Sequence, residues 1–468
     1  VTGKNLDRLK DSLFYYEQKL ETLKSQISKL DPLYDELKTH QKLLSFEEFQ
    51  ASLKPSEVFL EYFYHDSDLF AFIIGKDAHS FQKIALSENY EALLADFLSG
   101  FTYKKDGPQF PDEKYIEQAS QLYKILLQPL WKSLENELSV APEKLIIVAD
   151  GELNYLPWGA LLTGKPDDIK NYRSYPFLEK ELKIRLAFSA SLMKFLESKP
   201  SQKKEMMLAF APGYLTKGEI FAGKKGSESR SCEDIFDPNF TELTQSKLEL
   251  DKILSHIGGE RFDSLEAREN KFKELAKDHR LIHLSMHGFI DNCDPMYSGL
   301  AFTPKSMLEK SGEKISKDPT NDGILHAYEI YNMQLNAELL VMSACETGLG
   351  EIQKGEGVMS IARAFAYAGS KNTIMSLWQV EESATRRLMD VLYKHIAAGK
   401  GKDDALQLAK KEYIHRYQNA HPYYWAGFTL IGDDKAIEFD PWWQRNIWIV
   451  VLAFLLLLLA LFLRKRRG

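Results

Sequence analysis

One cysteine in this chain stands where a strand pattern gives way to glycines. The apolar run 339–342 leads through two small residues to Cys345, and Gly348 and Gly350 follow. A run of Leu, Val and Met without alternation is typical of a strand buried on both faces of a parallel sheet. Cys345 is therefore predicted at the carboxyl edge of the sheet, where open α/β folds build their sites.

An upstream segment, residues 280–288, repeats this design: an apolar strand ends in His287 and Gly288. If the two strands are neighbours, His287 and Cys345 project from the same edge. A thiol becomes a strong nucleophile when a base removes its proton, and an imidazole within hydrogen-bond reach is the usual base. The backbone N–H groups of Gly288 and Cys345 would then form a two-donor oxyanion hole. The pattern points to acyl transfer at a thiol.

Other interpretations of the same residues stay open at this point. A cysteine at a strand end is often a small buried hydrophobe, and a lone histidine is often a hydrogen-bonded core residue. A zinc site could use His283, His287 and Cys293. The histidine pair lies on a strand pattern, however, with neither helical i,i+4 spacing nor a second cysteine pair, so neither a metal nor a cofactor is predicted.

Three further blocks follow the cysteine in order: residues 365–370 (FAYAGS), 376–380 (SLWQV) and 421–428 (HPYYWAGF). Together with Met286-His287-Gly288 and the segment 343–348 (SACETG), they resemble the CHAT-domain peptidases. This family belongs to the cysteine-peptidase clan of caspases, separase and gingipains. The resemblance runs from about Pro55 to Asp434. It implies a His–Cys dyad with His287 as base and Cys345 as nucleophile, and both positions are filled.

The composition sets bounds on the class of protein. The chain has 468 residues, 44% of them hydrophobic and 27% charged, which is ordinary for globular domains. A formal net charge of −7 and the lack of a basic stripe argue against nucleic acid as a partner. Three cysteines cannot form a disulfide framework. Because the chain begins with Val1, we expect a fragment, and the resemblance implies an upstream helical repeat module.

Residues 1–54 are predicted to form a helical arm or the end of a truncated helical repeat region. Apolar residues recur at three- or four-residue steps, with one exception between Leu13 and Leu20, at Leu6, Leu9, Leu13, Leu20, Leu23, Ile27, Leu30, Leu33 and Leu37. One long helix, a helical hairpin, a coiled-coil arm and the last helix of a repeat array all fit this pattern.

Residues 55–204 are predicted to form a non-catalytic α/β half. A β-hairpin (58–64 and 69–75) precedes two helices, at about 87–103 and 112–138. A buried strand (143–151) follows, which 156–162 is predicted to continue. No His–Cys pair stands at matching strand ends, so this half is either a pseudo-peptidase partner of the catalytic half or an unrelated α/β subdomain.

Residues 205–436 are predicted to form the catalytic caspase-like half. Its charged segment 304–322 is predicted to be a loop. In caspase-like enzymes, loops in this region line the substrate cleft or are themselves cleaved by proteolysis. A solvated surface loop fits the pattern equally well. Residues 372–380 are predicted as a further strand, whose Trp378 would wall a substrate pocket or simply pack. A carboxylate from Asp322, Glu381 or Glu382 would select a lysine or arginine side chain, unless these are solvent-facing charges.

The C-terminal segment from Ile447 to Leu463 is uninterrupted apolar sequence. As a helix it would span about 25 Å, the short end of a bilayer crossing. Three tryptophans precede or open it and the basic run 464–467 closes it, so residues 445–464 are predicted as a transmembrane helix with a basic tail to 468. The positive-inside rule puts the tail in the cytoplasm and the catalytic body outside, and a tail-anchored cytoplasmic protein is the alternative.

The overall prediction is an α/β protein with a caspase-like, mostly parallel sheet flanked by helices. A pseudo-caspase-like half and a helical arm precede it, and a transmembrane helix follows. We predict a membrane-anchored cysteine endopeptidase that cleaves protein substrates through an acyl-enzyme. The alternatives are a catalytically silent signalling scaffold and a latent protease that needs its missing N-terminal module.

Overall fold

The computed structural model describes part of the chain. Described are the ranges 44–101, 110–134, 137–200, 205–214, 240, 242–291, 294–313, 318, 320–343, 357–417 and 420–439, together with Tyr15, Tyr16, Gln18, Lys19 and Thr22. The predicted nucleophile Cys345, the zinc candidate Cys293 and the predicted membrane helix 445–464 lie outside these residues, as does most of the predicted arm.

The apolar runs of the predicted catalytic half form the parallel strands of one end of a large sheet. They are β6 (Glu205–Pro212), β7 (Glu260–Ser264), β8 (His279–Leu284), β12 (Leu339–Met342) and β13 (Thr373–Ser376). Along the sheet they follow the order β13-β12-β8-β6-β7, and each pairs in parallel with the next. Every residue of β12 and β13 is buried, because helices lie on both faces. The predicted mostly parallel sheet is confirmed.

The N-terminal half supplies the other end of the same sheet. Its strands are β1 (Glu57–His65), β2 (Asp68–Ile74), β3 (His79–Ile84), β4 (Lys144–Val148) and β5 (Lys183–Leu186). The predicted hairpin is confirmed, since β1 and β2 pair in antiparallel fashion through the His65–Asp68 turn. Strand β14 (Phe428–Ile431) lies between the halves, parallel to β5 and antiparallel to β13. The sheet therefore has eleven strands among the described residues, and the predicted domain boundary near 204 stays a prediction.

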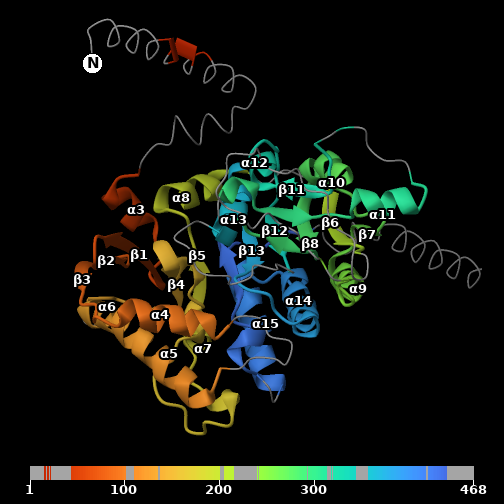
Figure 1. The fold of residues 1–468 in the computed structure, drawn as a ribbon. Coiled ribbons are helices and arrows are strands. Elements are labelled where there is room, and N and C mark those ends of the chain that lie inside the picture. The colour runs from red at the N-terminus through yellow and green to blue at the C-terminus, as the bar shows by residue number, and fades with distance from the viewer. Residues whose placement is uncertain are drawn as a thin grey trace, which may run out of the picture.

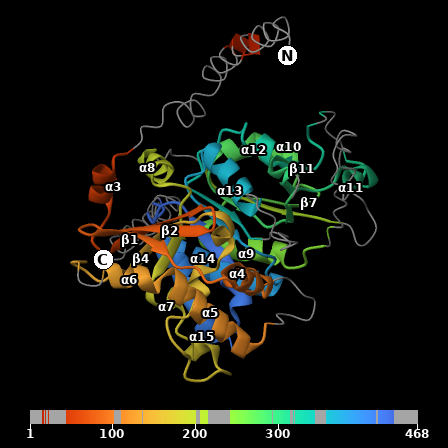
Figure 2. The same ribbon diagram turned by 60° about the vertical axis from the view of Figure 1, so that its left-hand side comes forward.

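The helices form a layer on each face of the sheet (Figures 1 and 2). On one face lie α4 (Tyr90–Ser99), α5 (Asp112–Leu126), α6 (Gln128–Leu134), α7 (Leu178–Glu181), α9 (Ser246–Ile257), α14 (Glu382–Ala397) and α15 (Lys402–Arg416). On the other lie α3 (Phe46–Ser52), α8 (Ala190–Ser198), α10 (Glu269–Leu275), α12 (Ala327–Ile330) and α13 (Gly357–Tyr367). One continuous cluster of buried apolar side chains includes residues of both halves.

Some predicted elements were wrong. Residues 156–162 do not continue β4: two 3₁₀ turns, Gly151–Tyr155 and Trp158–Ala160, stand there instead. Pro157 between them has no backbone N–H to donate to a strand ladder. The predicted loop 304–322 contains the short helix α11 (Lys305–Lys310). Among the described residues no helix combines the length and apolar character needed to cross a bilayer.

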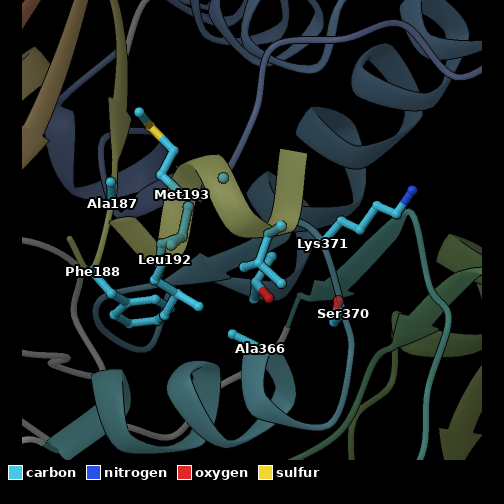
Figure 3. Close-up of a pocket in the computed structure, with 11 residues that line it drawn as sticks. Ala187, Phe188, Leu192, Met193, Ala366, Ser370 and Lys371 are labelled. Carbon is cyan, nitrogen blue, oxygen red and sulfur yellow. The ribbon is translucent and has the colours of Figure 1, made fainter. Parts of the chain in front are cut away.

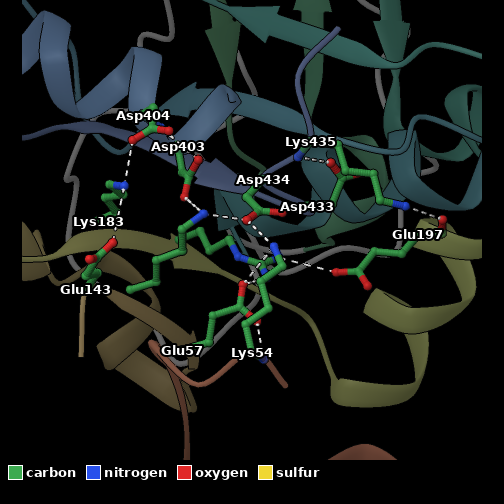
Figure 4. Close-up of polar contacts among 12 residues, drawn as sticks. Lys54, Glu57, Glu143, Lys183, Glu197, Asp403, Asp404, Asp433, Asp434 and Lys435 are labelled. Atoms are coloured by element: carbon green, nitrogen blue, oxygen red, sulfur yellow. Dashed lines mark hydrogen bonds and ion pairs between the residues drawn. The ribbon is translucent and has the colours of Figure 1, made fainter. Parts of the chain in front are cut away.

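Charged side chains join the two halves near the starts of β1, β4 and β5. We call this group the amino-edge network; it comprises Lys54, Glu57, Glu143, Lys144, Lys183, Arg185, Glu197, Asp403, Asp404, Asp433, Asp434 and Lys435 (Figure 4). Lys144 Nζ lies 2.9 Å from Asp403 Oδ2 and also contacts Asp434. Lys54 Nζ lies 2.7 Å from Asp434 Oδ2. The network therefore ties the starts of β1, β4 and β5 to the segment after β14.

Candidate functional site

The two predicted catalytic residues follow strands β8 and β12 in the sequence, and these two strands are neighbours. They pair in parallel, with Leu284 opposite Met342 as the last strand pair. The N–H of Ser343 donates to the carbonyl of Leu284 at 3.1 Å, which extends the alignment one step further. His287 follows Leu284 by three residues, and Cys345 follows Met342 by three. The predicted adjacency of the two strands is confirmed, while Cys345 itself lies outside the described residues.

The imidazole of His287 is held in an aromatic setting. It is buried, with 1% of the residue exposed. Phe240 stacks on the ring at 4.9 Å between centroids, and Tyr214 meets it edge-on at 4.7 Å. The Tyr214 hydroxyl accepts the backbone N–H of His287 at 3.2 Å and donates to the carbonyl of Ala301 at 2.5 Å. The ring and the backbone of His287 are therefore both held by residues that follow β6 in the sequence.

Gly288 begins strand β9 (Gly288–Phe289), which pairs antiparallel with β10 (Gly299–Ala301). Gly288 faces Leu300, and the N–H of Ala301 donates to the carbonyl of His287. In this pattern Gly288 and Leu300 form a non-hydrogen-bonded pair, whose own N–H groups point away from the partner strand. The N–H of Gly288 is thus directed away from β10, as an oxyanion donor requires.

A hollow of about 410 Å³, open solvent included, lies beside His287 at the carboxyl ends of β8, β12 and β13. Its lining residues come from these strand ends and from α9 and α14: Leu243, Gln245, Ser246, Glu249, Ser285, His287, Ser343, Gln379, Val380, Glu382 and Thr385. Nine of the eleven lining residues have polar side chains, and two of these carry carboxyl groups, so the hollow offers hydrogen-bond partners to a cationic group.

Of the predicted substrate-binding residues, Glu382 lies in this hollow. Its Oε2 accepts the N–H of Gln245 at 2.7 Å. Burial raises the pKa of Glu382, the bond from Gln245 opposes this shift, and the carboxyl groups of Glu381 and Glu249 add to it. Glu381 instead caps helix α14, since it accepts the N–H groups of Ser383 and Ala384.

Trp378 and Asp322 lie elsewhere. Trp378 is buried, stacks on Phe101 at 4.5 Å and donates its indole N–H to the carbonyl of Tyr423 at 2.9 Å. It is a core residue, and the following residue Gln379 lines the hollow instead. Asp322 accepts the N–H of Ile324 at 3.0 Å at the start of β11 (Ile324–His326). Strand β10 separates β11 from β9, the strand of Gly288.

Beneath the hollow lies a buried polar network that was not predicted. His283 Nε2 lies 2.8 Å from Glu249 Oε1, and His283 Nδ1 lies 3.0 Å from the hydroxyl of Tyr393. The hydroxyl of Ser343 lies 3.3 Å from His283 Nε2. Glu249 stands four residues before Ile253 on the buried face of α9. A charged residue at a helix position that otherwise faces the core was the sequence signal that could have identified Glu249.

No group of three or more His, Cys, Asp or Glu side chains arranged to hold a metal ion occurs among the described residues. A second hollow, of about 280 Å³, lies between α8 and α13 near the junction of β5 and β14 (Figure 3). It shares no lining residue with the hollow beside His287, and most of its lining is apolar, including Phe188, Leu192 and Ala366. Ser370, Lys371 and Thr373 supply its polar side chains.

Comparison with known proteins decides the family. The model of the CHAT domain matches residues 117–433, more than half of the chain. The chain belongs to the CHAT domain family. The match starts later than Pro55, where the sequence resemblance was expected to begin, and ends near the predicted Asp434. All the described residues that line the hollow of this CHAT domain fall within the match.

Two curated relatives share part of the chain. Tetratricopeptide repeat protein 28 of Homo sapiens is 32% identical over 128 residues, which cover 27% of this chain and 5% of that protein. The protein of the same name from Mus musculus is 29% identical over 120 residues, covering 26% and 5%. The chain thus spans a small part of the length of these relatives.

Solved structures with some likeness to this chain include a separase complex and a gingipain. Saccharomyces cerevisiae separase, in its complex with securin, has a TM-score of 0.46 and 10% identity, covering 82% of this chain and 30% of that one. The Arg-specific cysteine proteinase gingipain R has a TM-score of 0.37 and 9% identity, covering 75% and 76%. Scores this low support no argument about fold or function.

Proposed function

We propose that this CHAT domain is a cysteine endopeptidase with His287 as base and Cys345 as nucleophile. The observation that carries the proposal is the β8–β12 register, in which both residues stand three positions beyond the last strand pair. Cys345 is the second residue after Ser343, so their Cα atoms lie at most about 7 Å apart. Ser343 lines the same hollow as His287. Family membership adds support, since the motifs of CHAT-domain peptidases are filled here.

The proposed reaction follows the usual course of thiol acyl transfer. His287 takes the proton of the Cys345 thiol, and the thiolate attacks the carbonyl carbon of the scissile peptide bond. The N–H groups of Gly288 and Cys345 hold the oxyanion. The C–N bond then breaks as His287 returns its proton to the leaving amine. Water, deprotonated by His287, hydrolyses the thioester and restores the thiol.

A preference for lysine or arginine before the scissile bond is part of this proposal. Of the three carboxylates predicted for it, Glu382 has the best support because it lies in the hollow beside His287. Glu249 supplies a second carboxyl group to the same lining. A charge-assisted hydrogen bond to such a group stabilises a bound cation by about 1.5–3 kcal/mol.

The test is the rate of alkylation by iodoacetamide, followed by mass spectrometry that assigns the label to Cys232, Cys293 or Cys345. We expect Cys345 to react fastest in the native protein and its rate to fall at least tenfold in His287→Ala. His279→Ala is the matched control, because His279 lies at the far end of β8. Slow labelling of Cys345 that is insensitive to His287 would contradict the dyad and favour a silent scaffold.

Membrane anchoring and an upstream repeat module remain proposals as well. The apolar run Ile447–Leu463 with its basic tail supports a single membrane span, with the catalytic body outside the cytoplasm. The name of the curated relatives supports a helical repeat module before the CHAT domain. Protease added outside intact cells tests the sidedness, since it should degrade a catalytic body that lies outside the cytoplasm. A body that is degraded only when protease acts from the cytoplasmic side would reverse the proposed orientation.

A further inference from the structure

One face of the N-terminal hairpin exposes a row of phenylalanines. Phe63, Phe72 and Phe81 are 51%, 42% and 55% exposed, and the half-buried Phe70 lies among them. The Phe72 and Phe81 rings are 4.5 Å apart, and those of Phe70 and Phe81 are 5.7 Å apart. We call these four residues the Phe strip. Contiguous exposed apolar surface of this kind marks an interaction site.

The Phe strip continues a surface that is already covered at one end. Side chains alternate along strands, so Phe63 shares its face with Phe59 and Phe72 shares its face with Ile74. Helix α3 covers Phe59, on which the Phe49 ring packs at 4.6 Å. Phe46, at the start of α3, meets His79 of β3 at 4.9 Å. The start of α3 therefore lies beside the uncovered part of this face, since His79 and Phe81 are neighbours on the same side of β3 (Figure 2 shows α3 beside β1 and β2).

The segment that precedes α3 carries a complementary apolar stripe. When Tyr16 is included, apolar residues alternate at steps of three and four without exception: Leu6, Leu9, Leu13, Tyr16, Leu20, Leu23, Ile27 and Leu30. This spacing lines one side of a helix. The described residues of the segment are helical, and Tyr16 is 64% exposed. The stripe, like the Phe strip, is uncovered where the structure describes it.

The sequence between the stripe and α3 favours a break in the helix, at which the chain can turn. Pro32 cannot sit inside a helix but is well tolerated in its first turn, and Asp31 before it suits a helix cap. Three neighbouring strands are about 10 Å wide, which a helix crosses in about two turns. The chain between Leu30 and Leu44, when extended, is longer than the width of three strands. The apolar stripe can therefore reach the Phe strip.

We propose that the segment 6–30 folds back and lays its apolar stripe across the Phe strip, extending the cover that α3 begins. Opposite charges are available on the two surfaces. Glu61 lies across from Phe72 on the same face, and Lys10 and Lys24 flank the stripe. Docking of this segment is independent of the peptidase proposal, because no residue of the hollow takes part.

Site-directed photocrosslinking of the full chain tests the docking. Benzoylphenylalanine replaces Phe81, and after irradiation the adducts are separated by mass and digested for peptide identification. We expect an adduct at the mass of one chain that joins residue 81 to a peptide within 1–43. Adducts at twice that mass would mean a second copy on the strip, and no adduct to 1–43 would mean no docking; either overturns the proposal. Benzoylphenylalanine at the exposed Tyr328 is the control and should not capture 1–43.

Hydrogen exchange gives a second measurement that keeps all body residues native. The double variant Leu20→Ser, Leu23→Ser removes two stripe positions, and we expect amide exchange in peptides from 68–84 to rise at least tenfold. The matched control is Gln18→Ser with Thr22→Ser, on the polar side of the same helix, and should leave the exchange unchanged. Equal exchange in both variants and the native chain would overturn the docking.

Discussion

Glu382 and Glu381 are adjacent carboxylates with different tasks, which substitution can separate. Glu382 lines the hollow beside His287, and Glu381 caps α14. We expect Glu382→Gln to lower kcat/KM for peptides with lysine or arginine before the cleaved bond by about 10- to 100-fold relative to neutral peptides. Glu381→Gln should leave this ratio unchanged and lower the free energy of unfolding by about 1 kcal/mol. Cleavage of a peptide library and urea unfolding measure the two effects, and an unchanged ratio in Glu382→Gln would remove the preference.

Glu269 should make stability depend on pH near neutrality. It is buried at the start of α10, where its carboxylate accepts the N–H of Gly323 at 2.8 Å and pairs with Lys273. Burial raises the pKa of Glu269 to about 7, against the opposing pull of Lys273. A raised carboxyl pKa stabilises the fold fully below the unfolded value of about 4.5, and this contribution is lost as pH rises through about 7.

The variant Glu269→Gln isolates this contribution, because an amide does not titrate. Relative to Glu269→Gln, the native protein should lose about 3 kcal/mol of unfolding free energy between pH 4.5 and pH 8. Urea unfolding across this range measures the difference. The exposed Glu266→Gln is the control, and its difference from the native protein should stay constant. A constant difference for Glu269→Gln would refute the shift.

The candidate site could be predicted from the sequence where residues follow apolar strands. His287 and Gly288 stand at a strand end that the alternation-free pattern 280–284 identifies. Trp378 also follows a buried strand, yet its indole fits the core against Phe101. The position of a residue just after a buried strand therefore predicts that it lies at the edge of the sheet. It does not predict where the side chain points. The Glu249–His283 pair was missed because it forms between elements far apart in sequence.

At the scale of elements, strands with long apolar runs were predictable and half-exposed strands were not. β3 (His79–Ile84) alternates exposed and half-buried residues until its last position, and β7 (Glu260–Ser264) contains no fully buried residue. Both lie at outer edges of the sheet, where one side of the strand lacks a partner among the described residues. Their formation depends on pairing with β2 and β6, which local sequence does not reveal.

The amino-edge network links these elements by charge, and Asp434 is central to it. Burial opposes ionisation of Asp434, but Lys144 and Lys54 outweigh burial and hold its pKa well below the ordinary carboxyl value. A lowered pKa stabilises the fold above the unfolded value of about 4, and this contribution is lost as pH falls through the folded value.

We therefore expect Asp434→Asn to lower the free energy of unfolding by about 2 kcal/mol at pH 7 and to differ less from the native protein at pH 3. Urea unfolding at the two pH values checks this. Asp68→Asn is the control, since Asp68 pairs with Lys83 on an exposed edge and should matter little. A difference that grows toward pH 3 would contradict the sign.

At the scale of the whole molecule, both halves should unfold together. They share one sheet and one continuous apolar cluster among the described residues. Urea unfolding followed by 5-fluorotryptophan NMR reports on each half through Trp158 and Trp425, both buried. We expect the two signals to change at the same urea concentration. Separate midpoints would mean that the predicted boundary near 204 divides independently stable units.

The position of β14 has a consequence for how the protein is made. It is the last described strand along the chain, yet it occupies the middle of the sheet between β5 and β13. During synthesis both of those strands wait with an open edge until residues 428–431 emerge. Open edges invite pairing with other chains. Late in translation the nascent protein is therefore most exposed to misassembly, and a chaperone that shields strand edges would help it most at that stage.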